Sequence, residues 1–471
     1  MSKGNKIIIL IVVLGLLIGS YIFMKNRPTK KEDAEGEQEK IELSKVEKDK
    51  INKMVLQSKD STLTFIKKGE EWSIDYPHPV KLKQTYIDDI AYSFASLYAE
   101  RVVDENPDDL SQYGLKEPSV KAWAELEDGK KTKVFYLGDK APTGNNYYIM
   151  IEGDPKVYAV WMNHGEHFSY KMDDIREKKL TEINVQELSY LKMVIADKTV
   201  IEIKENDNRS EDEAQFGLGM WKMIKPYNQP MGVDSNGIEK VLSDIPNLEI
   251  KGFIDDDPSD LGQYGLDVPS RELVVKDKSN TVHLYFGKDA GDDEVYFKTA
   301  DSNAVYTMAK EKVSFMDIKP FELVEKFAFI VNIDDVDKIV VEGEGKAHTL
   351  TLERSTKKAE KEGEEDEIET VYKVDGKEVE ESPFKKYYQS IIGLLVDAEN
   401  DKESTEKAEV KTTFFLNKGK DREIHVDYVP YDRDFYSVVR QGKAEFIISR
   451  DQVHKMLEDL ELLIQGKLEN D

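Results

Sequence analysis

The sequence predicts an α+β protein in which one N-terminal transmembrane helix precedes tandem repeated modules of mainly antiparallel sheet, with one or two helices each. Three observations lead to this prediction. A long apolar segment stands near the start of the chain, a turn motif occurs twice about 150 residues apart, and short β-branched and aromatic runs surround each copy. Runs of strands with few intervening helices favour the α+β class over an alternating α/β fold.

The apolar segment extends from Ile7 to Met24. At 1.5 Å per residue, its roughly 18 residues span about 27 Å, close to the thickness of a bilayer's hydrocarbon core. We therefore expect residues 1–24 to form a short tail and a transmembrane anchor. Gly19, Ser20 and Tyr21 are a weak candidate for a signal-peptidase site, but the length of the apolar run favours an anchor that stays attached.

Lysine and arginine residues flank both ends of the anchor, and the positive-inside rule slightly favours the opposite orientation to the one we expect. A short tail before a large body is nevertheless typical of a signal anchor, and long domains translocate largely regardless of charge. We expect a single-pass protein of the cell membrane with Leu43–Asp471 outside the cytoplasm. The polar residues 25–44 are expected to form a flexible linker.

Two copies of one motif organise the body of the chain. Asp109–Leu115 has the sequence Asp-Leu-Ser-Gln-Tyr-Gly-Leu, and Asp260–Leu266 has Asp-Leu-Gly-Gln-Tyr-Gly-Leu. Further matches on both sides keep the same order, beginning with Trp72 in the first copy and Trp221 in the second. The spacing indicates a duplicated domain and is too long for a solenoid repeat.

The remaining length accommodates a third, more degenerate unit that has lost this motif. A Lys- and Glu-rich insertion inside the third unit is most simply a solvated loop. The expected boundaries are residues 45–180 for the first module, 181–327 for the second and 328–468 for the third, with the acidic insertion at 357–369.

Within a module the sequence predicts strands, one helix, the turn motif and then further strands. Tyr86–Tyr98 places apolar residues at helical spacing, as does Pro383–Val396 in the third unit. Lys198–Lys204 alternates as a half-buried strand does. Further predicted strands are β-branched and aromatic runs, at Val134–Tyr136, Tyr147–Ile151, Val157–Val160, His348–Leu352, Thr412–Leu416 and Ile424–Tyr428.

The turn motif has a structural explanation. Asn106 is suited to cap a helix, with Pro107 at its first position, and Asp257 is the expected cap in the second copy. Gly114 suits the left-handed position just past the helix end, from which Leu115 can pack back on the helix. The predicted structural turn residues are Asp109, Leu110, Tyr113, Gly114, Leu115 and Pro118, then Asp260, Leu261, Tyr264, Gly265, Leu266 and Pro269.

These residues carry a family resemblance. The turn motif is followed by Leu137-Gly138-Asp139, the Tyr147-Tyr148 pair and Val157-Tyr158, and together they resemble the domain of unknown function 4340 family. The resemblance implies a bacterial envelope protein that accompanies an ABC transporter similar to the gliding-motility type. It brings no catalytic residues. The second copy departs from the pattern at Gly287-Lys288-Asp289.

The composition excludes several classes of function. The formal net charge is -27, which argues against a nucleic-acid partner because phosphate backbones require basic surfaces. The chain has no cysteine, so it has no disulfide, no thiolate nucleophile and no Cys-ligated zinc.

The sequence predicts no catalytic, cofactor-binding or metal-binding residue. His164 and His167 are three residues apart with Glu166 between them, but no third ligand is identifiable, and an exposed polar loop is the expectation. The acidic runs 255–257 and 292–294 lack the alternating pattern of a calcium loop and are expected to be solvated. Phosphate-binding loops, nucleophile elbows and metalloprotease helices are also absent from the sequence.

We therefore expect a non-enzymatic, membrane-anchored envelope protein that is an accessory or structural partner of an ABC-type transporter complex, with transporter membrane subunits as partners and no cofactor. The alternative is an extracytoplasmic ligand-binding or hydrolytic module that acts on cell-wall or saccharide material. The alternative rests on the 23 tyrosines and on the tendency of sites to lie between domains.

Overall fold

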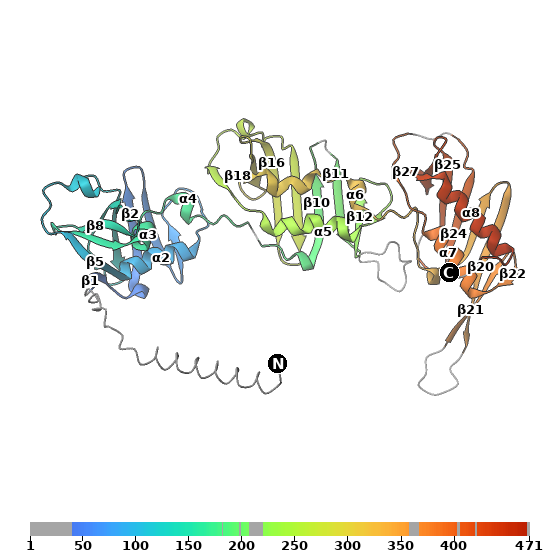
Figure 1. The fold of residues 1–471 in the computed structure, drawn as a ribbon, viewed down its shortest axis with the longest axis horizontal. Coiled ribbons are helices and arrows are strands. Elements are labelled where there is room, and N and C mark those ends of the chain that lie inside the picture. Colours follow the sequence, from blue (N-terminus) through green and yellow to red (C-terminus); the bar gives the residue numbers. More distant parts are fainter. Residues whose placement is uncertain are drawn as a thin grey trace, which may run out of the picture. The chain divides into compact units, whose positions relative to one another are not determined.

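The computed structural model describes residues 40–180, 182–196, 199–206, 220–357, 367–402, 406–419 and 422–468. The chain divides into two compact units, Met1–Glu177 and Lys178–Asp471. The first unit holds one nine-stranded sheet and the second holds two (Figure 1). The predicted class, mainly antiparallel sheets in tandem with a few helices, is confirmed.

The first sheet has the strand order β1-β5-β9-β8-β7-β6-β2-β3-β4. Its strands are β1 (Ile41–Lys45), β2 (Ile51–Ser58), β3 (Thr62–Lys68), β4 (Glu71–Ile74), β5 (Ser96–Asp104), β6 (Val120–Leu126), β7 (Phe135–Lys140), β8 (Asn146–Ile151) and β9 (Val157–Trp161). Its helices are η1 (Lys48–Lys50), α2 (Gln84–Ala95), η2 (Leu110–Tyr113), α3 (Met162–Phe168) and α4 (Met172–Ile175).

The second sheet has the order β13-β12-β11-β10-β15-β16-β17-β18-β14. Its strands are β10 (Leu188–Val194), β11 (Val200–Glu205), β12 (Trp221–Lys225), β13 (Met231–Gly232), β14 (Gly252–Asp255), β15 (Arg271–Asp277), β16 (Thr281–Asp289), β17 (Glu294–Thr299) and β18 (Val305–Ala309). Its helices are η3 (Val185–Glu187), α5 (Ser235–Asp244), η4 (Ile245–Asn247), η5 (Gly262–Tyr264), η6 (Lys310–Asp317) and α6 (Pro320–Leu323).

The third sheet has the order β22-β21-β20-β19-β24-β25-β26-β27-β23. Its strands are β19 (Val336–Gly343), β20 (Lys346–Lys357), β21 (Glu367–Val374), β22 (Lys377–Val379), β23 (Ala398–Glu399), β24 (Val410–Leu416), β25 (Glu423–Pro430), β26 (Phe435–Arg440) and β27 (Lys443–Ser449). Its helices are η7 (Ile333–Asp335), α7 (Glu381–Ile392) and α8 (Arg450–Ile464).

The three sheets follow the same path, except that the first begins with the additional edge strand β1 and its first meander has three strands where the others have four. A first meander starts in the middle of the sheet and steps outward to one edge, after which a helix (α2, α5 or α7) crosses the sheet. The next strand (β5, β14 or β23) lies at or near the other edge of the sheet. A second meander then starts beside the first strand of the first meander and steps outward until its last strand pairs with β5, β14 or β23. The third module, expected to be degenerate, therefore keeps the complete strand order.

One face of the first sheet forms the core of its module. Leu63 and Phe65 on β3 are buried, whereas Thr62 alternates with them and is exposed, as in a sheet with one solvated face. The helix α2 covers the apolar face with Ile87, Ile90 and Phe94 among its buried residues (Figure 1). The helical spacing in the sequence thus correctly identified the face of α2 that packs on the sheet.

Two predicted helix ends are wrong. The helix expected over Tyr86–Tyr98 stops at Ala95, and β5 begins at the next residue. Leu97 is a buried residue of β5. Its position in the sequence fits the two-residue period of a strand as well as it fits the period of a helix. In the third module, α7 ends at Ile392, before the expected Val396, and the amide of Gly393 donates to the carbonyl of Gln389 at 2.8 Å.

Parts of the expected linker and of the expected insertion belong to strands. Ile41–Lys45 forms β1 and pairs with β5, so the first module begins inside the segment expected to be a linker. Lys357 and Glu367–Glu369 belong to the paired strands β20 and β21, so these ends of the expected insertion are not loop. Residues 358–366 and the predicted anchor Ile7–Met24 lie outside the described residues.

Within the part of the chain that the structure describes, no helix is both long and apolar enough to cross a bilayer.

The second and third modules, which belong to the same unit, are joined by side chains as well as by the chain. One continuous set of buried apolar residues includes members of both modules. The Tyr227 hydroxyl donates a 2.6 Å hydrogen bond to Oε1 of Glu399, and the Tyr227 ring lies 4.9 Å from the ring of Phe446. The pKa of Tyr227 is raised, because burial and the Glu399 carboxylate both disfavour the phenolate.

We expect Tyr227→Phe to weaken this joint by about 1–2 kcal/mol, because the ring stays while the Glu399 carboxylate loses a donor. Hydrogen exchange measured by mass spectrometry on the full chain should show faster exchange around β23 and β27. The matched control is Tyr431→Phe, which removes a 2.6 Å bond to Asp401 at an exposed position and should leave exchange unchanged. Equal effects of the two substitutions would contradict the assignment.

Candidate functional site

The duplicated turn motif is the feature that the first two modules share in most detail. In the first module it forms the short 3-10 helix η2 between β5 and β6. The carboxylate of Asp109 accepts hydrogen bonds from the Ser111 backbone at 2.9 Å and from the Ser111 hydroxyl at 2.6 Å. Gly114 ends the turn with φ 64°, and the amide of Leu115 donates to the carbonyl of Leu110 at 3.0 Å. This return bond has the Schellman pattern that the sequence predicts.

The predicted start of the turn is wrong in both copies. Asn106 is not the cap, because the helix begins four residues later and Asp109 caps it. In the second copy, Leu261 and not Asp257 precedes η5, and the carboxylate of Asp260 accepts from the amide of Gly262 at 2.8 Å. An aspartate that bonds two residues ahead builds its own turn, and this local bond sets the start of the helix more strongly than the upstream proline does.

The tyrosine of the motif contacts the preceding strand. Tyr113 Oη donates a 3.0 Å hydrogen bond to Oδ2 of Asp104, and its ring meets the ring of Tyr148 edge-on at 5.1 Å. The second copy repeats both contacts, as Tyr264 donates to Asp255 at 3.2 Å and meets Tyr296 edge-on at 5.0 Å. The two aspartates are not among the predicted turn residues, although each stands nine residues before its tyrosine.

A strand glycine receives the turn in each copy. A Cβ atom on Gly138 would lie 2.2 Å from the carbonyl oxygen of Tyr113, and one on Gly287 would lie 2.1 Å from that of Tyr264. These distances are far below van der Waals contact, so only glycine fits there without movement of the backbone. The Leu-Gly of the strand and the Tyr-Gly-Leu of the turn are therefore two halves of one packing arrangement.

The third module supports this interpretation by contrast. The strand pairing shows which residue of the third module corresponds to Gly287. In the second module Arg271 pairs with Phe286, and in the third Val410 pairs with Tyr428. The residue after Tyr428, Val429, therefore stands at the position of Gly287. The third module also lacks the Tyr-Gly-Leu turn. The glycine and the turn are thus absent together, as expected if the turn is what requires the glycine.

We expect Tyr113→Phe to destabilise the first module by about 1 kcal/mol, because the half-buried Asp104 carboxylate loses a donor while the ring stacking remains. Urea unfolding followed by tryptophan fluorescence is a suitable measurement, since Trp72, Trp123 and Trp161 all lie in this module. Tyr136→Phe is the control, because its 2.7 Å bond to Glu152 is exposed. A loss no larger than that of the control would show that the Tyr113 bond adds no stability.

The histidine pair forms a buried cluster, so the expectation of an exposed loop is wrong. His164 and His167 lie on α3, and His164 is only 7% exposed. Nδ1 of His164 lies 3.0 Å and Nδ1 of His167 lies 2.8 Å from the hydroxyl of Ser93, which is fully buried on α2. A hydroxyl has one hydrogen, so it donates to one ring and accepts an N–H from the other.

This cluster holds the two helices together and has little scope for chemistry. Burial lowers the pKa of His164 to about 4, and burial also lowers the pKa of His167 below its ordinary value. Both rings are therefore neutral near pH 7. A serine beside a histidine is the pairing that activates a nucleophile, but a substrate cannot reach a hydroxyl with no exposed surface.

The acidic runs are engaged in local contacts. Asp255 lies on β14 and accepts the hydrogen bond of the motif tyrosine. Glu294 pairs with Lys251 at 2.8 Å, and the Lys251 ammonium holds the pKa of Glu294 below its ordinary value. Among the described residues, no three histidine or acidic side chains are placed to hold a metal ion.

A sequence model for the family described as "Domain of unknown function (DUF4340)" matches residues 72–218 and 221–410, which together make up most of the chain. Each matched segment contains one copy of the turn motif and its strand glycine. No curated protein and no solved structure matches the chain.

Proposed function

The chain belongs to the DUF4340 family, and we propose that it is a non-enzymatic, membrane-anchored protein of the cell envelope that works as an accessory or structural partner of an ABC-type transporter complex. The observation that carries the proposal is the use of the duplicated residues. Tyr113, Gly114 and Gly138 hold the turn against its strand, and their counterparts do the same in the second module. Residues used in this way build a scaffold for other surfaces.

The predicted anchor supplies the location. The apolar run Ile7–Met24 supports a single-pass protein whose modules lie outside the cytoplasm. Protease added to intact protoplasts should then digest the modules while cytoplasmic proteins survive. A body that remains protected until the membrane is lysed would mean the opposite orientation, and a mature N-terminus near Tyr21 would mean a cleaved signal.

The partner is tested by cross-linking in native membranes, followed by purification of the chain. We expect to recover membrane subunits of an ABC-type transporter. The matched control carries an unrelated transmembrane helix in place of residues 7–24, so that its modules stay at the membrane. Recovery with both chains would assign the contact to the modules, and recovery with the native chain alone would assign it to the anchor. Recovery of unrelated proteins only would overturn the proposal.

A second candidate is an extracytoplasmic module that binds saccharide or cell-wall material. It is favoured by aromatic rings on the surface of the first module, where Tyr92 is 51% exposed and Trp161 is 47% exposed. Exposed aromatic faces can stack on sugar rings. Sedimentation of the full chain with purified cell wall tests this candidate. Retention that is lost in Trp161→Ala and kept in Trp72→Phe, where the ring is buried, would favour it over the transporter partner.

A further inference from the structure

A polar groove lies on the solvated face of the first sheet. Its volume is about 500 Å³, in the range of small-molecule sites, and its walls come mainly from β2, β3 and β6. Met54 and Leu56 of β2 belong to the core that α2 covers, whereas Val55 between them lines the groove on the opposite face. The groove therefore opens away from the core of the module.

The lining combines one large ring with short polar groups. The ring is that of Trp123, which is half-buried. The polar members around it include Asn52, Gln57, Thr64, Asp75 and Glu125. Amide and carboxylate oxygens accept hydrogen bonds, and the threonine hydroxyl both donates and accepts. The groove thus offers a flat apolar surface surrounded by hydrogen-bonding groups.

The charges of the lining disfavour an anionic ligand. Asp75 and Glu125 are acidic, and the basic member is Lys53, whose Nζ lies 3.4 Å from Oε1 of Glu125. Two carboxylates and one ammonium leave a net negative charge, which repels phosphate and carboxylate groups. A neutral molecule rich in hydroxyl groups meets no such repulsion.

The groove also holds a buried acceptor. The pairing of β2 with β6 is irregular between Ile51 and Lys53, and Asn52 lines the groove at this point. Within the part of the chain that the structure describes, Oδ1 of Asn52 is buried and receives no hydrogen bond. Buried acceptors are normally paired, because an unpaired one is costly. A ligand hydroxyl that donates to Oδ1 would satisfy it.

The second module has charged side chains at the same place. β10 repeats the irregularity of β2 near its start, and counting from it places Lys192 at the position of Val55. Lys192 pairs with Val274, as Val55 pairs with Trp123. Nζ of Lys192 lies 2.9 Å from Oε2 of Glu272 on the neighbouring strand. An ion pair thus lies on the sheet where the first module has the groove.

The third module confirms that the fold does not require the ring. β19 has the same irregularity, which places Val340 at the position of Val55, and Val340 pairs with Thr413. The position of Trp123 is therefore valine in one related module and threonine in the other. A large ring at a strand position that the shared sheet fills with small residues favours a role in binding.

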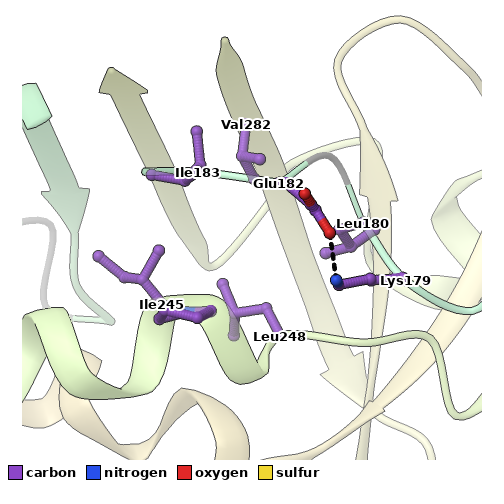
Figure 2. A pocket seen from close by; sticks show the side chains of 8 residues that line it. Lys179, Leu180, Glu182, Ile183, Ile245, Leu248 and Val282 are labelled. Carbon is purple, nitrogen blue, oxygen red and sulfur yellow. Dashed lines mark hydrogen bonds and ion pairs between the residues drawn. The ribbon is translucent and has the colours of Figure 1, made fainter. Parts of the chain in front are cut away.

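The groove differs in kind from the small pocket of the second module. That pocket lies between the segment that leads into the module and the end of its crossing helix (Figure 2). Lys179 and Glu182 form an ion pair at its edge. Its aliphatic members include Ile183, Ile245, Leu248 and Val282. Aliphatic side chains offer no hydrogen bonds that orient a ligand, so the polar groove is the stronger candidate for a specific site.

We propose that the groove binds a neutral oligosaccharide. A pyranose ring carries C–H groups on its faces and hydroxyls around its edge, so one face stacks on the Trp123 indole while the edge meets the polar side chains. One sugar hydroxyl donates to Oδ1 of Asn52, and others donate to the carboxylates of Asp75 and Glu125. The ligand class is that of the second candidate function, but the site is separate from Trp161 and does not depend on the transporter partner.

The test is saturation-transfer difference NMR with the full chain in lipid nanodiscs. The probes are cellotetraose, maltotetraose and tetra-N-acetylchitotetraose, and titration of the signal gives the dissociation constant. We expect saturation transfer to the ring protons of at least one probe, beyond that of empty nanodiscs. Trp123→Thr introduces the residue of the third module and should weaken binding about tenfold, because the stacking surface is lost. Asn52→Ala should weaken it about fivefold, because one hydrogen bond is lost.

Two further variants complete the design. Thr64→Arg keeps the ring but fills the groove with a long side chain from β3, and should also weaken binding about tenfold. Trp161→Ala removes an exposed ring outside the groove and should leave binding unchanged.

Absence of transfer to all three probes, or equal binding by the wild-type chain, Trp123→Thr and Thr64→Arg, would overturn the proposal. Loss of binding in Trp161→Ala alone would also overturn it, because the sugar would then bind at the exposed ring. Circular dichroism establishes that each variant is folded, and either groove variant alone is sufficient for the comparison. The transporter partner is tested separately by cross-linking, so the two proposals can fail independently.

Discussion

Gly138→Ala is expected to destabilise the first module by about 3 kcal/mol, at the upper end of the range for overpacking. The added Cβ would lie 2.2 Å from the carbonyl oxygen of Tyr113 and 2.9 Å from the side chain of Leu115. The first of these atoms belongs to the backbone, so the clash cannot be relieved by a change of rotamer. The turn must move away from β7, and the Tyr113 hydrogen bond and the return bond of Leu115 are lost with it.

Urea unfolding and hydrogen exchange on the full chain measure this effect, and exchange should accelerate from β5 to β7. Gly287→Ala should produce a comparable loss in the second module, since the same backbone contact is 2.1 Å there. Gly343→Ala is the control, because its nearest neighbours are the flexible side-chain ends of Leu457 at 3.1 and 3.2 Å. If Gly138→Ala were no more harmful than Gly343→Ala, the turn and the strand glycine would not form one packing arrangement.

Acidification from pH 7 to pH 4 is expected to remove up to about 3 kcal/mol of stability from the first module through His164 alone. Burial holds the pKa of His164 at about 4 in the folded chain, below the ordinary value of 6.5. In this window the unfolded chain binds the proton that the folded chain excludes. The stabilising effect of neutral His164 is therefore complete above pH 6.5 and is lost as the pH falls towards 4.

The neighbours of the cluster modify this effect without reversing its sign. Burial also lowers the pKa of His167, which adds to the loss, while the carboxylates of Asp89 and Glu166 act in the opposite direction. A second proton would place two imidazolium rings on one Ser93 hydroxyl, which would then have no acceptor for its own hydrogen. We expect the contacts between α2 and α3 to open first.

The measurement is the free energy of unfolding at several pH values for the wild-type chain and for His164→Gln. Other groups also bind protons in this range. The test therefore compares how steeply the free energy of unfolding changes with pH in the two chains, and does not rest on its value at one pH. The variant should show a shallower slope between pH 6.5 and 4. His425→Gln, at an exposed position of the third module, should keep the wild-type slope. Parallel slopes for wild type and His164→Gln would contradict the assignment.

Local patterns in the sequence predicted the mainly antiparallel class and several of the strands. Strands such as β8 and β9 combine β-branched and aromatic residues with flanking turn residues, and the left-handed Gly114 follows from its place after the turn. The strand order of the third module was harder to predict from the sequence, because strand order depends on which apolar faces meet and not on a shared motif. Its sequence lost the turn, and its alternating strands still assemble in the same order.

The candidate site was less predictable because its contacts join distant residues. Ser93 is an ordinary helix residue until α3 brings two histidines to it from 71 and 74 positions away. The partnership of Asp104 with Tyr113 has a clearer signal, since Asp255 and Tyr264 repeat its spacing. The strand glycine was visible in the sequence, but its reason is a backbone contact that only the folded chain contains.

The shared path of the three sheets also has a consequence for the rate of folding. In each sheet, the two meanders meet at a single pair of central strands: β2 with β6, β10 with β15, and β19 with β24. Lys53 and Glu125, which bond across the first of these pairs, are 72 positions apart, and Lys192 and Glu272 across the second are 80 apart.

Each meander is built from neighbouring hairpins, so it can form early. Joining the two meanders requires the chain to close a long loop before the central contact contributes any stability. We therefore expect each module to collapse into two half-sheets whose central edges stay unpaired until the loop closes. During that interval the open edges of three similar modules could pair with one another, which makes the order in which the modules emerge and fold important to correct assembly.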